Sequence, residues 1–84
     1  MKNMQSRDAD LMATGRVIAR YKALNRLSIP ELAELTRCTQ GTVRSWLRGR
    51  CLPNPEHIEA LAEVFGVYPE DIVCFRDFDR EAER

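Results

Sequence analysis

The residues of this sequence with the most chemistry to offer lie between positions 40 and 50. At about 100° per residue, a helix in this segment places its polar side chains on one arc. That arc holds Gln40, Gly41, Arg44, Ser45 and Arg48. Amide and hydroxyl groups exchange hydrogen bonds with polar edges, and guanidinium groups bind anions such as phosphate. The arc therefore predicts a surface that recognises a polar, negatively charged partner.

The opposite arc of the same segment carries Thr42, Val43, Trp46 and Leu47. A mostly apolar side of this kind is predicted to be buried against other helices. Because Trp46 lies on it, we interpret this tryptophan as a core residue and not as one that stacks on a base. A segment with one polar and one apolar side needs neighbouring elements to fix its orientation.

Those neighbouring elements are predicted to be helices, because the sequence has no alternating β-branched run. The expected fold is all-α with five helices, in a single domain over residues 1–84 whose core covers about 10–75 and whose charged tail covers 76–84. The first helix is expected to begin between Ser6 and Asp10, the second at Ser28, the third after Thr39, the fourth after Asn54 and the fifth at Pro69.

Local signals place several of these boundaries. Ser28 and Glu31 have the spacing of a capping box, in which each residue satisfies a backbone donor of the other. Asn25 is expected to end the first helix in a left-handed conformation. Gly49 and Gly66 are expected to end the third and fourth helices, since glycine adopts that conformation without steric cost.

Two of the predicted helices are joined by about four residues, and the second of them carries the polar, basic arc. This is the helix-turn-helix layout, in which the second helix enters the major groove of DNA. The groove is about 12 Å wide and admits one helix. Short polar side chains near the start of that helix then reach base edges, while arginines at its end and on the following loop meet phosphates.

The stretch from Leu27 to Ile72 resembles, without gaps, the pattern of the phage repressor and Cro-like helix-turn-helix proteins, also called the XRE family. The residues that carry the resemblance are Leu27, Ser28, Glu31, Leu32, Ala33, Thr42, Val43, Arg48, Gly49, Pro55, Leu61, Gly66 and Val67. A weaker likeness extends back to Gly15 and Ile18, so the resemblance covers roughly residues 12–73. It implies a lambda-repressor-like fold and a sequence-specific transcriptional regulator that acts as a repressor on double-stranded DNA.

The resemblance also implies which residues touch the DNA. The base-reading positions fall on Gln40, Gly41, Arg44 and Ser45, and the phosphate contacts on Thr42, Arg48 and Arg50. Gln40 suits an adenine edge and Arg44 a guanine edge, whereas Gly41 permits close backbone approach. The alternative is that Arg44 and Arg48 lie on a solvated helix face and that Gln40 is an ordinary first-turn polar residue.

Three residues depart from the family pattern. Arg37 stands in the turn where the family usually has glycine, and Thr36 stands where a large apolar residue is usual. Ile29 replaces a glutamine that commonly touches phosphate, which leaves only backbone N–H groups for that contact. The core is still supplied by Leu32, Ala33, Cys38, Val43 and Trp46.

The charges of the chain are divided between its two halves. The net charge is zero, with thirteen basic and thirteen acidic residues. Residues 1–50 hold ten Lys or Arg and four acids, a net charge of +6, while residues 51–84 hold three Arg and nine acids, a net charge of −6. A polyanion would therefore meet the first half and be repelled by the second.

Nothing in the sequence points to an enzyme, a cofactor or a metal. Cys38, Cys51, His57 and Cys74 match no zinc spacing with paired ligands. There is no second histidine, no nucleophile with a paired base and no Gly-rich phosphate loop. No apolar stretch approaches the roughly 20 residues that cross a membrane, and the first ten residues lack the apolar core of a signal peptide. We expect a cytoplasmic location and no membrane partner.

A homodimer on an inverted-repeat operator is expected, because one helix reads too few base pairs to select a site in a genome. Ile72, Phe75 and Phe78 would form one stripe for the dimer interface if the fifth helix continued into the tail. The alternative is that these residues cover the domain's own core. The alternative function is a protein-binding module on the same fold, such as an antitoxin or a phage accessory factor.

Overall fold

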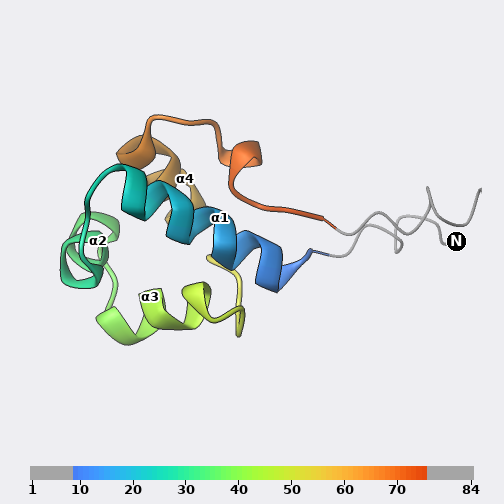
Figure 1. Ribbon diagram of the computed structural model, residues 1–84, viewed down its shortest axis with the longest axis horizontal. Coiled ribbons are helices and arrows are strands. Elements are labelled where there is room, and N and C mark those ends of the chain that lie inside the picture. The colour runs from blue at the N-terminus through green and yellow to red at the C-terminus, as the bar shows by residue number, and fades with distance from the viewer. Residues whose placement is uncertain (1–8, 76–84) are drawn as a thin grey trace, which may run out of the picture.

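Four α-helices and one short 3-10 helix make up the computed structural model, which describes residues 9–75 (Figure 1). The elements are α1 (Leu11–Leu24), α2 (Ile29–Thr36), α3 (Gln40–Leu47), α4 (Pro55–Phe65) and the 3-10 helix η2 (Pro69–Asp71). Within residues 9–75 the only β-pairing is an isolated antiparallel bridge between Ala9 and Phe75. The predicted all-α class is confirmed for this part of the chain. None of its helices has the length and apolar character needed to span a membrane.

Every α-helix begins at a side chain that caps it. The capping oxygens accept hydrogen bonds from backbone N–H groups at 3.0 Å (Asp10 from Ala13), 3.2 Å (Ser28 from Glu31), 3.1 Å (Thr39 from Thr42) and 2.8 Å (Asn54 from His57). Glu31 Oε1 also accepts from the Ser28 N–H at 2.8 Å, which confirms the predicted capping box. The Ser28 backbone bond, followed by its side-chain bond, lowers the pKa of Glu31 below its ordinary 4.5. The predicted starts of α2, α3 and α4 are confirmed.

Two arginines hold left-handed backbone conformations at helix ends. Arg26 follows α1 with φ 58°, and Arg37 follows α2 with φ 61°. The prediction that Asn25 takes this conformation is wrong, because its φ is −94°. Asn25 instead donates to the carbonyl of Tyr21 both from Nδ2, at 2.8 Å, and from its backbone N–H, at 3.0 Å. Gly66 has φ 72° and ends α4 as predicted.

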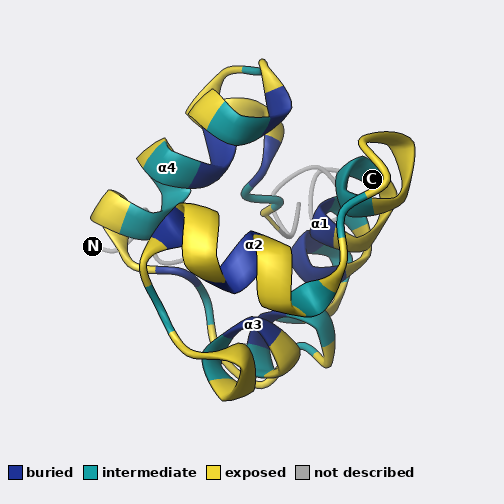
Figure 2. Cartoon of the chain, turned by 90° about the vertical axis from the view of Figure 1, so that its left-hand side faces the viewer, coloured by how far each residue is buried: buried dark blue, intermediate teal, exposed yellow. Residues whose placement is uncertain are grey.

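The core lies where the inner sides of the four α-helices meet, with their exposed sides outward (Figure 2). Its buried apolar residues are Ile18, Leu32, Ala33, Val43, Trp46, Leu61, Ala62, Phe65 and Ile72. The rings of Tyr21 and Phe65 stack at 5.3 Å between centroids and join the ends of α1 and α4. The predicted burial of Trp46 is confirmed, since only 1% of this residue is exposed. Cys38 is half-buried and packs against this core.

The expected fifth helix begins at Pro69 as predicted, but it is only the short 3-10 helix η2 and does not continue through Phe75. η2 is three residues long. After Ile72 the chain turns back and runs alongside the start of α1, where Phe75 pairs with Ala9. Asp10 donates its N–H to the Cys74 carbonyl at 2.8 Å, and the Cys74 N–H donates to Thr14 Oγ1 at 2.9 Å. These partners on α1 take the backbone groups that a helix would pair internally, so the segment stays extended.

Candidate nucleic-acid interface

The orientation of α3 is set by its buried side. Val43 is 0% exposed and packs into the core beside Trp46. Helical geometry then turns the other side of α3 outward, where Gln40, Gly41 and Arg44 are exposed. Ser45 is half-buried at the edge of this outer face. The predicted base-reading residues therefore share one side of α3, with Ser45 at its margin.

Gln40 and Arg44 are one helical turn apart and touch each other. Arg44 Nη2 donates to Gln40 Oε1 at 3.5 Å, a long hydrogen bond between two exposed side chains. Gln40 and Arg44 can contact the same partner without a change in the helix, because side chains at i and i+4 lie one above the other. The two side chains together present several N–H donors on one spot of the outer face.

The start of α3 is held by a pair of threonines. The hydroxyls of Thr39 and Thr42 are 2.9 Å apart, and Thr39 Oγ1 also accepts from the Thr42 N–H. Thr42, a predicted phosphate contact, is half-buried. Its backbone N–H and its hydroxyl both contact Thr39 in the cap. Its hydroxyl retains a free lone pair or proton for a further partner.

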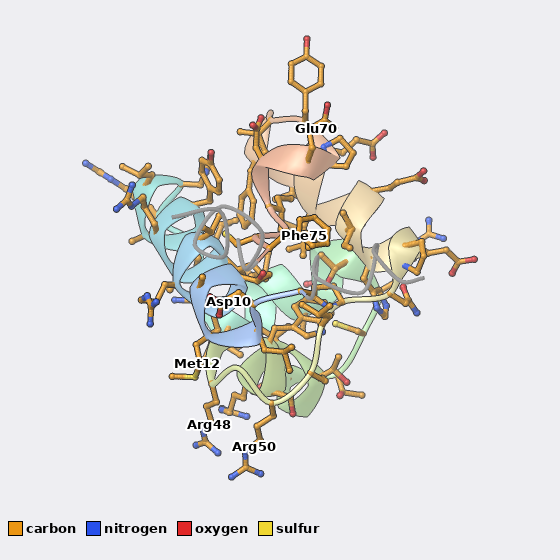
Figure 3. All side chains as sticks on the ribbon, turned by 90° about the vertical axis from the view of Figure 1, so that its right-hand side faces the viewer. Asp10, Met12, Arg48, Arg50, Glu70 and Phe75 are labelled. Carbon is orange, nitrogen blue, oxygen red and sulfur yellow. The ribbon has the colours of Figure 1, made fainter. Side chains whose placement is uncertain are left out.

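The loop after α3 carries the other two predicted phosphate contacts. Arg48 and Arg50 are both exposed and project from the same end of the molecule (Figure 3). Between them Gly49 has φ 74°, which only glycine adopts without steric cost. A Cβ on Gly49 would lie 2.7 Å from Met12 Sδ, so this loop is pressed against α1.

The profile of a helix-turn-helix domain family matches residues 13–72 of the chain. The chain belongs to this helix-turn-helix family. Membership confirms the resemblance to the phage repressor and Cro-like proteins, and it places the chain among DNA-binding transcriptional regulators. No curated protein matches the sequence significantly.

Solved structures with the same fold include two regulators. The restriction-modification controller protein C.AhdI from Aeromonas hydrophila aligns with a TM-score of 0.70 and 24% identity over 75% of this chain and 96% of its own. The clp gene regulator ClgR from Corynebacterium glutamicum aligns with a TM-score of 0.67 and 24% identity over 73% of this chain and 65% of its own. At this level of identity the likeness shows a shared fold.

The helix-turn-helix turn keeps its geometry in spite of two departures from the family pattern. Arg37 adopts the left-handed conformation that the usual glycine would supply. Thr36 is buried, and its hydroxyl donates to the Leu32 carbonyl at 2.7 Å, so this buried polar group is satisfied. Ile29 packs half-buried against the core and offers no polar atom to a phosphate.

Sequence reasoning missed what brings α1 so close to α3. A Cβ on Gly15 would lie 2.5 Å from the Trp46 carbonyl oxygen and 3.0 Å from that of Leu47. Gly15 therefore lets α1 rest directly on the backbone at the end of α3. Its presence in the family pattern was a signal, but the partner across the contact is 31 residues away and is visible only in the fold.

The predicted dimer stripe does not form. Ile72 is 0% exposed inside the domain's own core, which is the alternative weighed for it above. Phe75 is 49% exposed and pairs with Ala9 through the isolated bridge. Because η2 ends at Asp71 and residues 73–75 are not helical, the two side chains do not have helical spacing. Phe78 lies outside the described residues.

The remaining titratable side chains form no second centre within residues 9–75. No group of three or more His, Cys, Asp or Glu is placed there to hold a metal ion. His57 is half-buried, and its ring lies 5.3 Å from that of Trp46 at an angle of 56°. This histidine thus packs on the core residue that anchors α3.

Proposed function

We propose that this protein binds double-stranded DNA at a specific sequence, with α3 in the major groove, and represses transcription there. The observation that carries the proposal is the division of α3 into a side fixed in the core by Val43 and Trp46 and an outer side of polar residues. A helix held this rigidly presents its side chains at constant positions, which base readout requires. The repressor role rests on the resemblance to phage repressors.

Each outer residue has a distinct part in the proposal. Arg44 bonds a guanine edge through two donors, and Gln40 bonds the neighbouring adenine. Gly41 and Ser45 let the helix approach the base pairs closely, and Ser45 adds one hydroxyl. Thr42, Arg48 and Arg50 meet the phosphates at either end of α3.

The proposal includes a two-fold dimer. Two copies of α3 about 34 Å apart would read an inverted repeat with one DNA turn between half-site centres. Phe75 and Phe78 are the proposed interface residues, since Ile72 is enclosed in the core. Phe75 pairs with Ala9, and Figure 3 shows it between Glu70 and the end that carries Arg48 and Arg50. A partner bound at Phe75 would leave both copies of α3 free to face the same duplex.

Selection of bound sites from random duplexes tests the proposal. The protein should enrich an inverted repeat, and sedimentation should give the mass of a dimer. The variants Phe75→Asp and Phe78→Asp should lower the mass to that of one chain and reduce whole-site affinity towards half-site affinity. Recovery of no common sequence would contradict specific recognition, and a dimer that survives both changes would contradict the interface.

A second candidate function is protein binding on the same fold, as in an antitoxin or a phage accessory factor. A cleft of about 440 Å³ between α2 and α4 favours it, because it combines the exposed apolar Leu35 with the acids Glu56, Glu59 and Glu63. Such a lining suits a basic segment of a protein partner. Salt-dependent binding to duplex DNA separates the two functions: its absence would favour the second.

A further inference from the structure

One side of α1 carries a row of exposed residues that the proposed readout does not use. Met12, Arg16 and Arg20 are four residues apart and all exposed, so they form one stripe along the helix, named here the α1 track. Ala19 and Ala23 lie beside the arginines and are also exposed. Because alanine projects little, a large partner can come close to the helix between the two guanidinium groups.

The α1 track begins where the proposed phosphate contacts end. Met12 is packed on Gly49, the residue between Arg48 and Arg50, because a Cβ added to Gly49 would lie only 2.7 Å from the Met12 sulfur. Figure 3 shows Met12, Arg48 and Arg50 together at one end of the molecule, and side chains with nitrogen tips along α1 on the flank beside them. The loop that carries Arg48 and Arg50 is therefore adjacent to the start of the α1 track.

The charges on the α1 track are not neutralised within the described part of the chain. The structure records no ion pair between Arg16 or Arg20 and any other described residue. The described acids downstream of α3 gather elsewhere, on α4 and η2, and Glu70 lies at the opposite end of the molecule from Arg48 and Arg50 (Figure 3). Two guanidinium groups that have no acidic partner among residues 9–75 leave a local positive potential that attracts an anion.

We propose that the α1 track binds the sugar-phosphate backbone of the same DNA that α3 reads, with Arg16 and Arg20 as two further phosphate contacts. The inference rests on the proposed function. A helix in the major groove has a phosphate backbone along each side, and the start of α1 rests on the end of α3 through Gly15. Residues four apart rise about 6 Å along a helix, close to the roughly 7 Å that separate every second phosphate of one strand along the DNA axis.

The test is the salt dependence of binding by a double variant, Arg16→Ala with Arg20→Ala. Each phosphate contact adds about 0.9 to the slope of log affinity against log salt, so the slope should fall by about 2. Between 50 and 200 mM salt the ratio of wild-type to variant affinity should shrink about tenfold. All duplexes should be affected alike, because phosphate contacts carry no sequence information. Arg16→Lys with Arg20→Lys keeps both charges and should restore the slope.

Arg37→Gly is the matched control, because it removes one arginine from a turn that lines the acidic cleft and suits the left-handed φ of 61°. Its slope should be that of the wild type.

Neutral methylphosphonates placed one at a time beside the selected site add a second readout. Those along the α1 track should weaken DNA binding by the wild type and leave DNA binding by the double variant unchanged. An unchanged slope for the double variant, with a reduced slope for Arg48→Ala, would overturn the track and leave the proposed function standing. No salt-dependent duplex binding by the wild type would overturn the proposed function itself.

Discussion

The two ends of this small molecule are built with similar local devices and carry opposite charge. At one end Arg48 and Arg50 extend from the loop after α3, and at the other Glu70 and Asp71 lie on η2 (Figure 3). At each end a capped helix, α3 or α4, leads into a turn that contains a glycine with positive φ. These glycines are Gly49 and Gly66 respectively. The comparison shows that a domain of zero net charge can still orient itself on a polyanion, because the field depends on where the charges lie.

The largest expected effect on the basic end comes from a substitution of Gly15. Gly15→Ala puts a methyl group 2.5 Å from the Trp46 carbonyl, so α1 and α3 must move apart. Overpacking of this kind costs about 1–3 kcal/mol of unfolding free energy. DNA affinity should fall as well, because α3 and the α1 track shift relative to each other. Chemical denaturation and duplex titration measure the two effects.

The matched change at the acidic end is Gly66→Ala. No atom lies within 4 Å of the added Cβ, and only the φ of 72° opposes it. The cost should be about 1 kcal/mol, with unchanged affinity for DNA under folding conditions. If Gly15→Ala left affinity unchanged too, the contact between α1 and α3 would not position the reading helix.

Removal of a single charge from each end tests which end recognises the DNA sequence. Arg44→Ala should cost about 1–3 kcal/mol of binding free energy at the selected site and relax discrimination at one base pair. Glu63→Ala, on the exposed side of α4, should leave discrimination unaltered. Competition among duplexes that differ at one position provides the measurement. A loss that is equal on all sequences would make Arg44 a phosphate contact instead of a base-reading residue.

The caps test whether the two ends differ in stability as well as in charge. Ser28→Ala removes the cap of α2, next to the reading helix, and Asn54→Ala removes that of α4. Each should lower the unfolding free energy by about 1 kcal/mol. Denaturation midpoints that shift equally would show that the ends differ in charge and not in rigidity. A midpoint unmoved by Ser28→Ala would mean that the capping box does not form in solution.

The smallest expected effect is a gain in stability. Arg37 holds φ 61°, which costs a residue with a Cβ about 1–2 kcal/mol, while glycine adds entropy to the unfolded chain. Arg37→Gly should therefore stabilise the fold by about 0.5–1 kcal/mol net. Arg26→Gly, at φ 58° in the other turn, should behave alike. A loss of stability in both would show that the arginine side chains make contacts worth more than the backbone strain.

Sequence reasoning reached the helix starts and the two sides of α3, and both have local causes. A cap is a hydrogen bond between residues three apart, as at Ser28 and Glu31, so the signal and its partner lie in the same short window. The burial of Val43 and Trp46 follows from helical periodicity alone. The DNA contacts of the outer residues stay a prediction, since they depend on a partner.

The sequence by itself thus determined the four α-helices, their capped beginnings and the face that α3 turns outward, because each depends on residues within one or two helical turns. Only the tertiary structure decided the path of the chain after Asp71, where Cys74 bonds to α1 across 60 residues and Ile72 enters the core. It also decided that Gly15 would bring α1 onto α3 and that Met12 would pack on Gly49, between Arg48 and Arg50. These features depend on which distant backbone groups and side chains meet, and a short window of sequence does not contain both partners.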